Sequence, residues 1–131
     1  MITYNDRMTQ GQTKTITLRV RDSNGQPVDL DGDRVYFTMR ADIKIAPSVL
    51  LTNDTDQTSP WRQGIVLADQ TQYPGQFTIT MIPADTVSLV ALGDDDPWIY
   101  DVWLVDETLG TVPVVDKSTM GLYPPVTVVP G

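Results

Sequence analysis

The sequence predicts an all-β sandwich of about seven or eight short strands with one short helical turn. Three observations lead to this fold class. Short stretches rich in β-branched and aromatic residues alternate between apolar and polar side chains, which is the pattern of a strand with one buried face. Turn-forming residues separate these stretches. A chain of 131 residues is also long enough to form one domain with its own core.

Residues 1–12 are mostly polar and are expected to form an N-terminal arm or an irregular first strand. The single sandwich domain is expected over residues 13–131, with an extended C-terminal end over residues 123–131. Its first secure strand covers residues 13–21, where apolar side chains occupy every second position. The pair Asn24-Gly25 then favours a tight turn, because both residues tolerate positive φ angles.

The middle of the chain contains further strands. A second strand is expected over residues 34–41. The alternation weakens over residues 42–61, where Pro47 interrupts the apolar residues, so one short edge strand followed by an exposed loop is expected there. Alternation returns over residues 64–68 and 76–82, and each of these stretches predicts another strand.

Residues 83–89 are expected to form one or two helical turns. Proline suits the first turn of a helix because its missing N–H would have no partner there, and Pro83 occupies that position. The carboxylate of Asp85 would lie near the positive end of the helix dipole. The acidic run Asp94-Asp95-Asp96 follows, and we expect it to be a solvated loop tip, with electrostatic matching to a basic partner as the alternative.

The stretch over residues 98–106 is apolar on both faces of its predicted strand. Tyr100, Val102 and Leu104 share one face. Ile99, Trp103 and Val105 lie opposite, together with Asp101. A strand of this kind is covered on both sides, or its outer face meets another chain.

The last part of the chain predicts two more strands. Residues 111–116 form one of them, and Pro113 places it at a sheet edge or at a bulge because proline cannot donate a ladder hydrogen bond. Residues 117–123 are expected to cross over to a closing strand at 126–129.

Composition excludes several classes of function. The chain has no cysteine and no histidine, so it cannot form a Ser-His-Asp or Cys-His catalytic device or a thiolate metal site. Its net charge of -8 opposes binding to nucleic-acid phosphates. It has neither an apolar run of about 20 residues nor a signal peptide, so no membrane partner and no standard export are expected. We predict a non-enzymatic protein without a cofactor.

The spacing of Asp29, Asp31 and Asp33 suggests a weak candidate metal site, because alternate carboxylates of a turn can converge on calcium. The EF-hand pattern requires glycine and glutamate further along, and this sequence has Arg34 and Arg40 at those positions. The alternative is a solvated turn whose aspartates accept local hydrogen bonds.

Aromatic and aliphatic residues outside the predicted core are candidates for an interface, because tryptophan is a common anchor of protein contacts. For Trp103 the alternative is that the helical turn near residues 87–90 covers it. The candidate interface residues are Trp103, Trp61, Ile99, Val105 and Tyr123.

Several runs of the sequence resemble the N-terminal domain of tailed-phage baseplate upper proteins and related small phage structural proteins. These runs are VRDSNGQPVDLDG at residues 20–32, VYFTMR at 35–40, GQFTIT at 75–80, PADT at 83–86 and WIYDVWLVD at 98–106. The resemblance spans roughly residues 13–129. It implies an immunoglobulin-like antiparallel β-sandwich that is packed in several copies within a virion.

The resemblance also has two departures. This chain ends where the family's domain ends, and residues 93–97 form a longer acidic insertion than family members carry. The expected function is therefore that of a structural component in the baseplate, tail or head–tail region, and the first alternative is a decoration (cement) protein on the phage head. The expected partners are other virion proteins and copies of the chain itself, and the expected location is the virion.

The residues alone leave two other classes of binding function open. A carbohydrate- or receptor-binding module would stack exposed Trp61 or Tyr73 on sugar rings. A calcium-dependent binding domain would use the two aspartate clusters.

Overall fold

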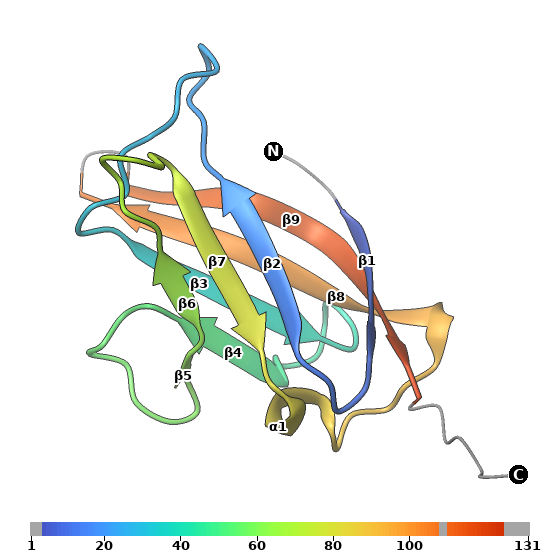
Figure 1. The fold of residues 1–131 in the computed structure, drawn as a ribbon. Coiled ribbons are helices and arrows are strands. Elements are labelled where there is room, and N and C mark those ends of the chain that lie inside the picture. Colours follow the sequence, from blue (N-terminus) through green and yellow to red (C-terminus); the bar gives the residue numbers. More distant parts are fainter. Residues whose placement is uncertain (1–3, 108–109, 125–131) are drawn as a thin grey trace, which may run out of the picture.

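The chain forms a two-layered β-sandwich, shown in Figure 1 as a computed structural model whose described residues are 4–107 and 110–124. The larger layer is a six-stranded sheet and the smaller layer is a three-stranded sheet. In order across the larger sheet, the strands are β1 (Asn5–Thr9), β9 (Gly110–Tyr123), β8 (Gly93–Asp106), β3 (Arg34–Arg40), β4 (Val49–Thr52) and β5 (Arg62–Gln63). The smaller sheet contains β2 (Lys14–Arg19), β7 (Gln76–Met81) and β6 (Ile65–Leu67).

The order and direction of the strands are those of an immunoglobulin-like sandwich. Strands β9, β8, β3 and β4 pair antiparallel in one sheet, and β2, β7 and β6 pair antiparallel in the other. This is the arrangement of a variable-type immunoglobulin domain, in which the larger sheet gains two extra strands. Two parallel pairs, β1 with β9 and β4 with β5, complete the edges of the larger sheet. The predicted fold class is confirmed.

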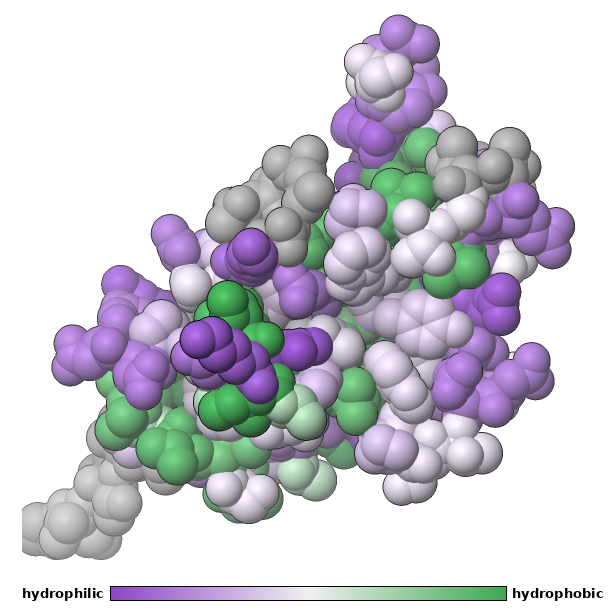
Figure 2. Space-filling model, turned by 180° about the vertical axis from the view of Figure 1, so that it is seen from behind, coloured by the Kyte–Doolittle hydropathy of each residue, from purple (hydrophilic) through white to green (hydrophobic). Residues whose placement is uncertain are grey.

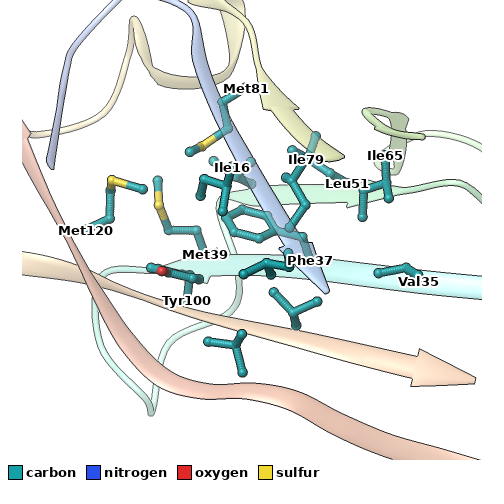
Figure 3. Packing of buried hydrophobic residues seen from close by; sticks show 14 of the residues in the cluster. Ile16, Val35, Phe37, Met39, Leu51, Ile65, Ile79, Met81, Tyr100 and Met120 are labelled. Carbon is teal, nitrogen blue, oxygen red and sulfur yellow. The ribbon is translucent and has the colours of Figure 1, made fainter. Parts of the chain in front are cut away.

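The core lies between the two sheets and follows the alternation of the sequence. Phe77, Ile79 and Met81 of β7 face Val35, Phe37 and Met39 of β3 from opposite layers, and all six side chains are fully buried. Figure 3 shows Ile79 and Met81 of one layer packed against residues of the other, among them Phe37. The ring of Phe37 also lies beside the ring of Tyr100 of β8. The two ring centroids are 5.5 Å apart and tilted by 31°, a favourable aromatic arrangement.

The short helix α1 (Pro83–Thr86) joins β7 to β8, as the sequence predicts. Four residues do not form a stable helix alone. Hydrogen bonds from the turn after β1 hold it: Gln10 Nε2 donates to the carbonyls of Thr86 and Val87 at 3.1 and 3.0 Å. Arg62 also forms an ion pair with Asp85. Tertiary contacts therefore fix α1 and the segment after it.

Two predicted element boundaries are wrong. Residues 93–97, predicted as a loop tip, belong to β8, although the register shifts between Gly93 and Trp98. Residues 117–123, predicted as a crossover, belong to β9. Residues 117–123 pair with β8 on one side and, along Thr119–Tyr123, with β1 on the other. In the first stretch, Gly93 pairs with Leu122 of β9. This pairing overrides the weak local pattern of the sequence.

Proline in β9 is accommodated in both of the ways predicted. β1 covers β9 only from Thr119 onward, so Pro113 lies in the half of β9 whose outer edge has no strand beside it among the described residues. The ladder between β8 and β9 also shifts register beside it, between the Val102 and Trp103 pairs. Of the predicted N-terminal arm, Asn5–Thr9 forms β1. The predicted closing strand at 126–129 lies outside the described residues.

Candidate interaction surface

The outer face of the six-stranded sheet carries a row of three aromatic side chains and one proline. In the sheet register, Tyr36 of β3 lies opposite Trp103 of β8, which lies opposite Pro113 of β9. Trp61 extends the row, since its ring meets Tyr36 edge-on with centroids 5.3 Å apart. We call these four residues the aromatic row. Figure 2 looks onto this face of the molecule.

Trp103 is the most exposed member of the row. Its side chain is 37% exposed, whereas those of Trp61, Tyr36 and Pro113 are half-buried. The segment after α1 contacts a different tryptophan, because Trp98 Nε1 donates to the carbonyl of Val90 at 2.9 Å. Trp98 is buried in the core. The alternation of β8 thus separates a core tryptophan from a surface tryptophan five residues later.

A polar network fixes the middle of the row. The hydroxyl of Tyr36 donates to Asp54 Oδ2 at 2.7 Å, and Asp54 is buried beside Thr52. Burial and this hydrogen bond raise the pKa of Tyr36. The same hydrogen bond lowers the pKa of Asp54, with help from the backbone N–H of Asp56. At neutral pH the pair is therefore a phenol bonded to a carboxylate, and it holds the Tyr36 ring against Trp61.

Four of the five predicted interface residues lie on this one face. Ile99 and Val105 flank Trp103 along β8, and both are half-buried. Trp61 joins them through its contact with Tyr36. Tyr123 is the exception, since it lies at the end of β9, where its hydrogen bond with Asp94 raises its pKa. An interface at these residues stays a prediction.

Charged and polar groups surround the row. Arg34 and Arg40 project from β3 on the same side, opposite Val105 and Ile99. Asp101 lies between Ile99 and Trp103, and its Oδ1 accepts the backbone N–H of Lys117 at 2.7 Å. The face therefore has an apolar centre and a polar border, which is the usual anatomy of a contact surface.

The three aspartates of the weak metal candidate line one hollow of about 250 Å³ at the end of the sandwich. Asp106 and Glu107 line it too, because the end of β8 lies beside the start of β3. The sequence spacing alone misses these two acids, although the antiparallel pairing of the strands brings them there. Asp29 Oδ1 accepts the N–H of Asp31 at 2.9 Å, a local hydrogen bond of the turn.

Asp33 is the buried member of this acidic hollow. Its side chain is 7% exposed, and burial together with the hydrogen bond to Asp106 raises its pKa to about 7. Repulsion from Asp29 and Glu107 acts in the same direction. Within residues 4–107 and 110–124, no group of three or more acids is arranged to hold a metal ion. Burial and the neighbouring carboxyl groups therefore favour the protonated form of Asp33.

The acidic run of β8 is partly engaged in the fold. Asp94 crosses over β9 at Gly121 and reaches Arg7 of β1, with 2.9 Å between Asp94 Oδ2 and Arg7 Nη2. A Cβ at position 121 would lie 2.4 Å from Asp94 Oδ1, so a larger residue there would displace this carboxylate. Asp95 and Asp96 remain exposed.

Two wider comparisons complete the description of the surface. Among the described residues, no helix is long and apolar enough to cross a membrane. No protein-family model and no curated protein matches this chain.

Proposed function

We propose that the chain is a non-enzymatic structural component of a tailed-phage particle that assembles in multiple copies. The observation that carries this proposal is the aromatic row exposed on a rigid sheet face. The resemblance of several sequence runs to phage structural proteins supports the setting within a virion, in the baseplate, tail or head–tail region or on the head surface.

The aromatic row has the features of a binding hot spot. Tryptophan and tyrosine are enriched among residues that dominate contact energy, and such residues are most effective when weaker contacts around them exclude water. Trp103 would be the anchor, and Ile99 and Val105 would provide the surrounding contacts. Because Tyr36 is fixed by Asp54, little side-chain entropy is lost when a partner covers the row.

Chemistry at this surface is not part of the proposal. The chain has no histidine or cysteine, and its aromatic row brings no acid–base pair to a cleft. Buried Asp33 and half-buried Asp106 lie at one end of the sandwich, away from the row. An adhesive function needs only shape, apolar area and a polar border, which this face provides.

Sedimentation velocity of purified protein over a range of concentrations, alone and with isolated tails or capsids, tests the proposal. We expect concentration-dependent assembly or particle binding by the natural chain. Trp103→Ala should abolish it, because truncation of an anchor residue reduces the binding free energy by about 2 kcal/mol or more at each contact. The matched control is Tyr73→Ala, which removes a 45% exposed aromatic ring from the turn before β7. Circular dichroism should show that both variants keep the fold.

Two results would contradict the proposal. One is a natural chain that stays monomeric at every concentration and binds neither tails nor capsids. The other is a Trp103→Ala variant that assembles as well as Tyr73→Ala does. Unfolding of Trp103→Ala would assign this side chain to the stability of the sheet.

The same row favours a second candidate, a carbohydrate-binding module, because aromatic rings on a flat face can stack on sugar rings. A glycan array distinguishes the two functions. Binding that Trp61→Ala abolishes would support the sugar site, and silence on the array together with assembly in the centrifuge would support the structural function.

A further inference from the structure

A second apolar surface lies at one end of the sandwich, apart from the aromatic row. Two segments form it: the loop between β3 and β4, and the segment between α1 and β8. Its side chains are 52–65% exposed, and they make up five of the nine large exposed hydrophobic residues of the described chain. We call this surface the end patch, and its members are Ile43, Ile45, Val87, Val90 and Leu92.

The two segments are neighbours in space. A small hollow of about 40 Å³ is lined by Ala41 from the first segment and by Val90 and Leu92 from the second. On the other side of Leu92 lies a wider hollow of about 460 Å³, which reaches Tyr123. Figure 2 shows apolar side chains gathered at this end of the molecule, at the lower left of the view. The end patch is thus one surface with two depressions.

Hydrogen bonds hold the end patch in place. Trp98 Nε1 and Gln10 Nε2 bond carbonyls of the segment after α1. In the other segment, the N–H of Ile45 donates to the carbonyl of Asp42 at 3.0 Å, and Arg40 donates to the carbonyl of Ile45 at 3.3 Å. A surface fixed in this way loses little conformational entropy on binding.

The border of the end patch is acidic. Asp95 and Asp96 are exposed beside Leu92, and each lines one of the two hollows. Asp42 adds a further carboxylate, while Lys44 is the single basic residue within the patch segments, 41–48 and 87–96. Complementarity therefore calls for a partner with positive charge at its border.

We propose that the end patch docks a second protein whose contact surface is aliphatic at its centre and rich in lysine or arginine at its border. Another copy of this chain fits less well, because it would bring the same aspartates and a net charge of -8. An anionic membrane would be repelled in the same way. The proposal is independent of assembly through the aromatic row.

Isothermal titration calorimetry with a defined peptide tests the proposal. The probe is a synthetic amphipathic helix with leucine on one face and lysine on the other, and its twin carries glutamate in place of lysine. The test variants are Leu92→Ser and Ile43→Ser, which change exposed side chains. Val66→Ser is the matched control, since Val66 is a 69% exposed aliphatic residue on β6.

We expect the lysine peptide to bind the natural chain and the Val66→Ser variant equally, and the two patch variants about tenfold more weakly. Asp95→Asn should also weaken binding, whereas Asp31→Asn, in the acidic hollow between the turn before β3 and the end of β8, should not. The glutamate peptide should not bind. Trp103→Ala should bind the peptide normally, so failure of this proposal and failure of the structural function are distinguishable.

Several outcomes would overturn the docking proposal. Equal binding of the lysine peptide by Leu92→Ser and Val66→Ser would remove the patch as its site. Self-association that Leu92→Ser abolishes would make a second copy the occupant. Binding of the natural chain to phosphatidylglycerol vesicles, lost in Leu92→Ser, would make a lipid surface the occupant.

Discussion

Asp33 shows how one residue couples the fold to pH. Its carboxyl group is buried next to Asp106, and its Oδ2 has no hydrogen-bond partner. Ionising it would place a second negative charge beside Asp106 in a poorly solvated position. The folded chain therefore keeps the proton on Asp33 up to a pH of about 7, while the unfolded chain releases it near the ordinary aspartate pKa of 3.8.

The free energy of unfolding should therefore include a contribution from Asp33 that decreases as the pH rises. The contribution is fully present below the pKa that Asp33 has in the unfolded chain, and it is lost as the pH rises through the pKa that Asp33 has in the folded chain. Asp33→Asn replaces the ionisable carboxyl group with an amide of the same shape, so the variant does not lose this contribution. The difference in unfolding free energy, variant minus natural chain, should therefore increase by roughly 1–3 kcal/mol between about pH 5 and about pH 8. Urea denaturation at both pH values measures the difference.

Asp31→Asn is the control for this prediction, because Asp31 is exposed in the same turn. Its stability should follow that of the natural chain at both pH values. An Asp33→Asn variant whose advantage stays constant with pH would show that Asp33 is ionised in the folded protein.

The alternation of the sequence predicts the burial of some residues, but it does not predict contacts between distant ones. Alternation along residues 98–106 correctly separated buried Tyr100, Val102 and Leu104 from exposed Trp103. It could not reveal the contact of Trp61 with Tyr36, because Trp61 lies outside the alternating stretches and the contact depends on the path of a loop. Nor could it pair Asp33 with Asp106, which are distant in sequence.

At the scale of elements, α1 is stabilised mainly from outside. The carboxamide of Gln10 donates to carbonyls at the end of the helix, and the backbone N–H of Gly11 donates to Thr86 Oγ1 at 2.9 Å. At the other end, Asp85 accepts the N–H of Ile82 at 2.8 Å and pairs with Arg62. The turn after β1 thus controls the segment that carries the end patch.

Gln10→Ala should loosen this segment. Carbonyls that are partly buried would lose their donor, at about 1–2 kcal/mol of unfolding free energy. Hydrogen exchange at the amides of Val87 and Leu89 should become faster, because these amides close the turn that Gln10 holds.

Gln12→Ala is the matched control for Gln10→Ala, since the exposed Gln12 lies in the same turn. Its effect should stay within about 0.5 kcal/mol. Equal exchange rates at Val87 and Leu89 in the two variants would show that the Gln10 carboxamide does not hold α1.

The elements that the sequence predicted least well are those defined by pairing. Residues 93–97 and 117–123 carry glycine, charges or polar residues, which are weak strand formers. Residues 117–123 pair with β8 and β1, and Gly93 pairs with Leu122 of β9. Strong local alternation, as in β3 and β7, needs no such help and was predicted within two residues.

For the whole molecule, charge opposes the assembly that the aromatic row favours. Copies with a net charge of -8 repel one another at low ionic strength. Raising sodium chloride from about 50 mM to about 500 mM shortens the range of this repulsion. Self-association through the row should therefore strengthen, which sedimentation equilibrium at the two concentrations would measure.

Salt should have the opposite effect on the end patch. Attraction between its aspartates and a lysine-rich peptide is screened by the same ions, so peptide affinity should fall. The aromatic row and the end patch thus respond to ionic strength with opposite signs.

The contradicting outcome for the aromatic row is self-association that weakens with added salt. It would mean that ion pairs, and not the apolar row, hold the copies together.

The architecture as a whole was predictable because many weak local signals agreed on two layers of strands. The order of the strands and the parallel edge pairs were not, because they depend on contacts between distant residues. The end patch was also hidden, since Ile43, Ile45 and Leu92 lie in stretches where no period marks them as exposed.

The hairpin over residues 21–27 stands away from the body of the sandwich, at the top of Figure 1. Its base is closed where the N–H of Val28 donates to the carbonyl of Val20 at 3.0 Å, and residues 21–26 are exposed. Extra amino acids at its tip would extend into solvent without disturbing the core. The protein thus has a ready position for displaying a foreign epitope or a fluorescent label.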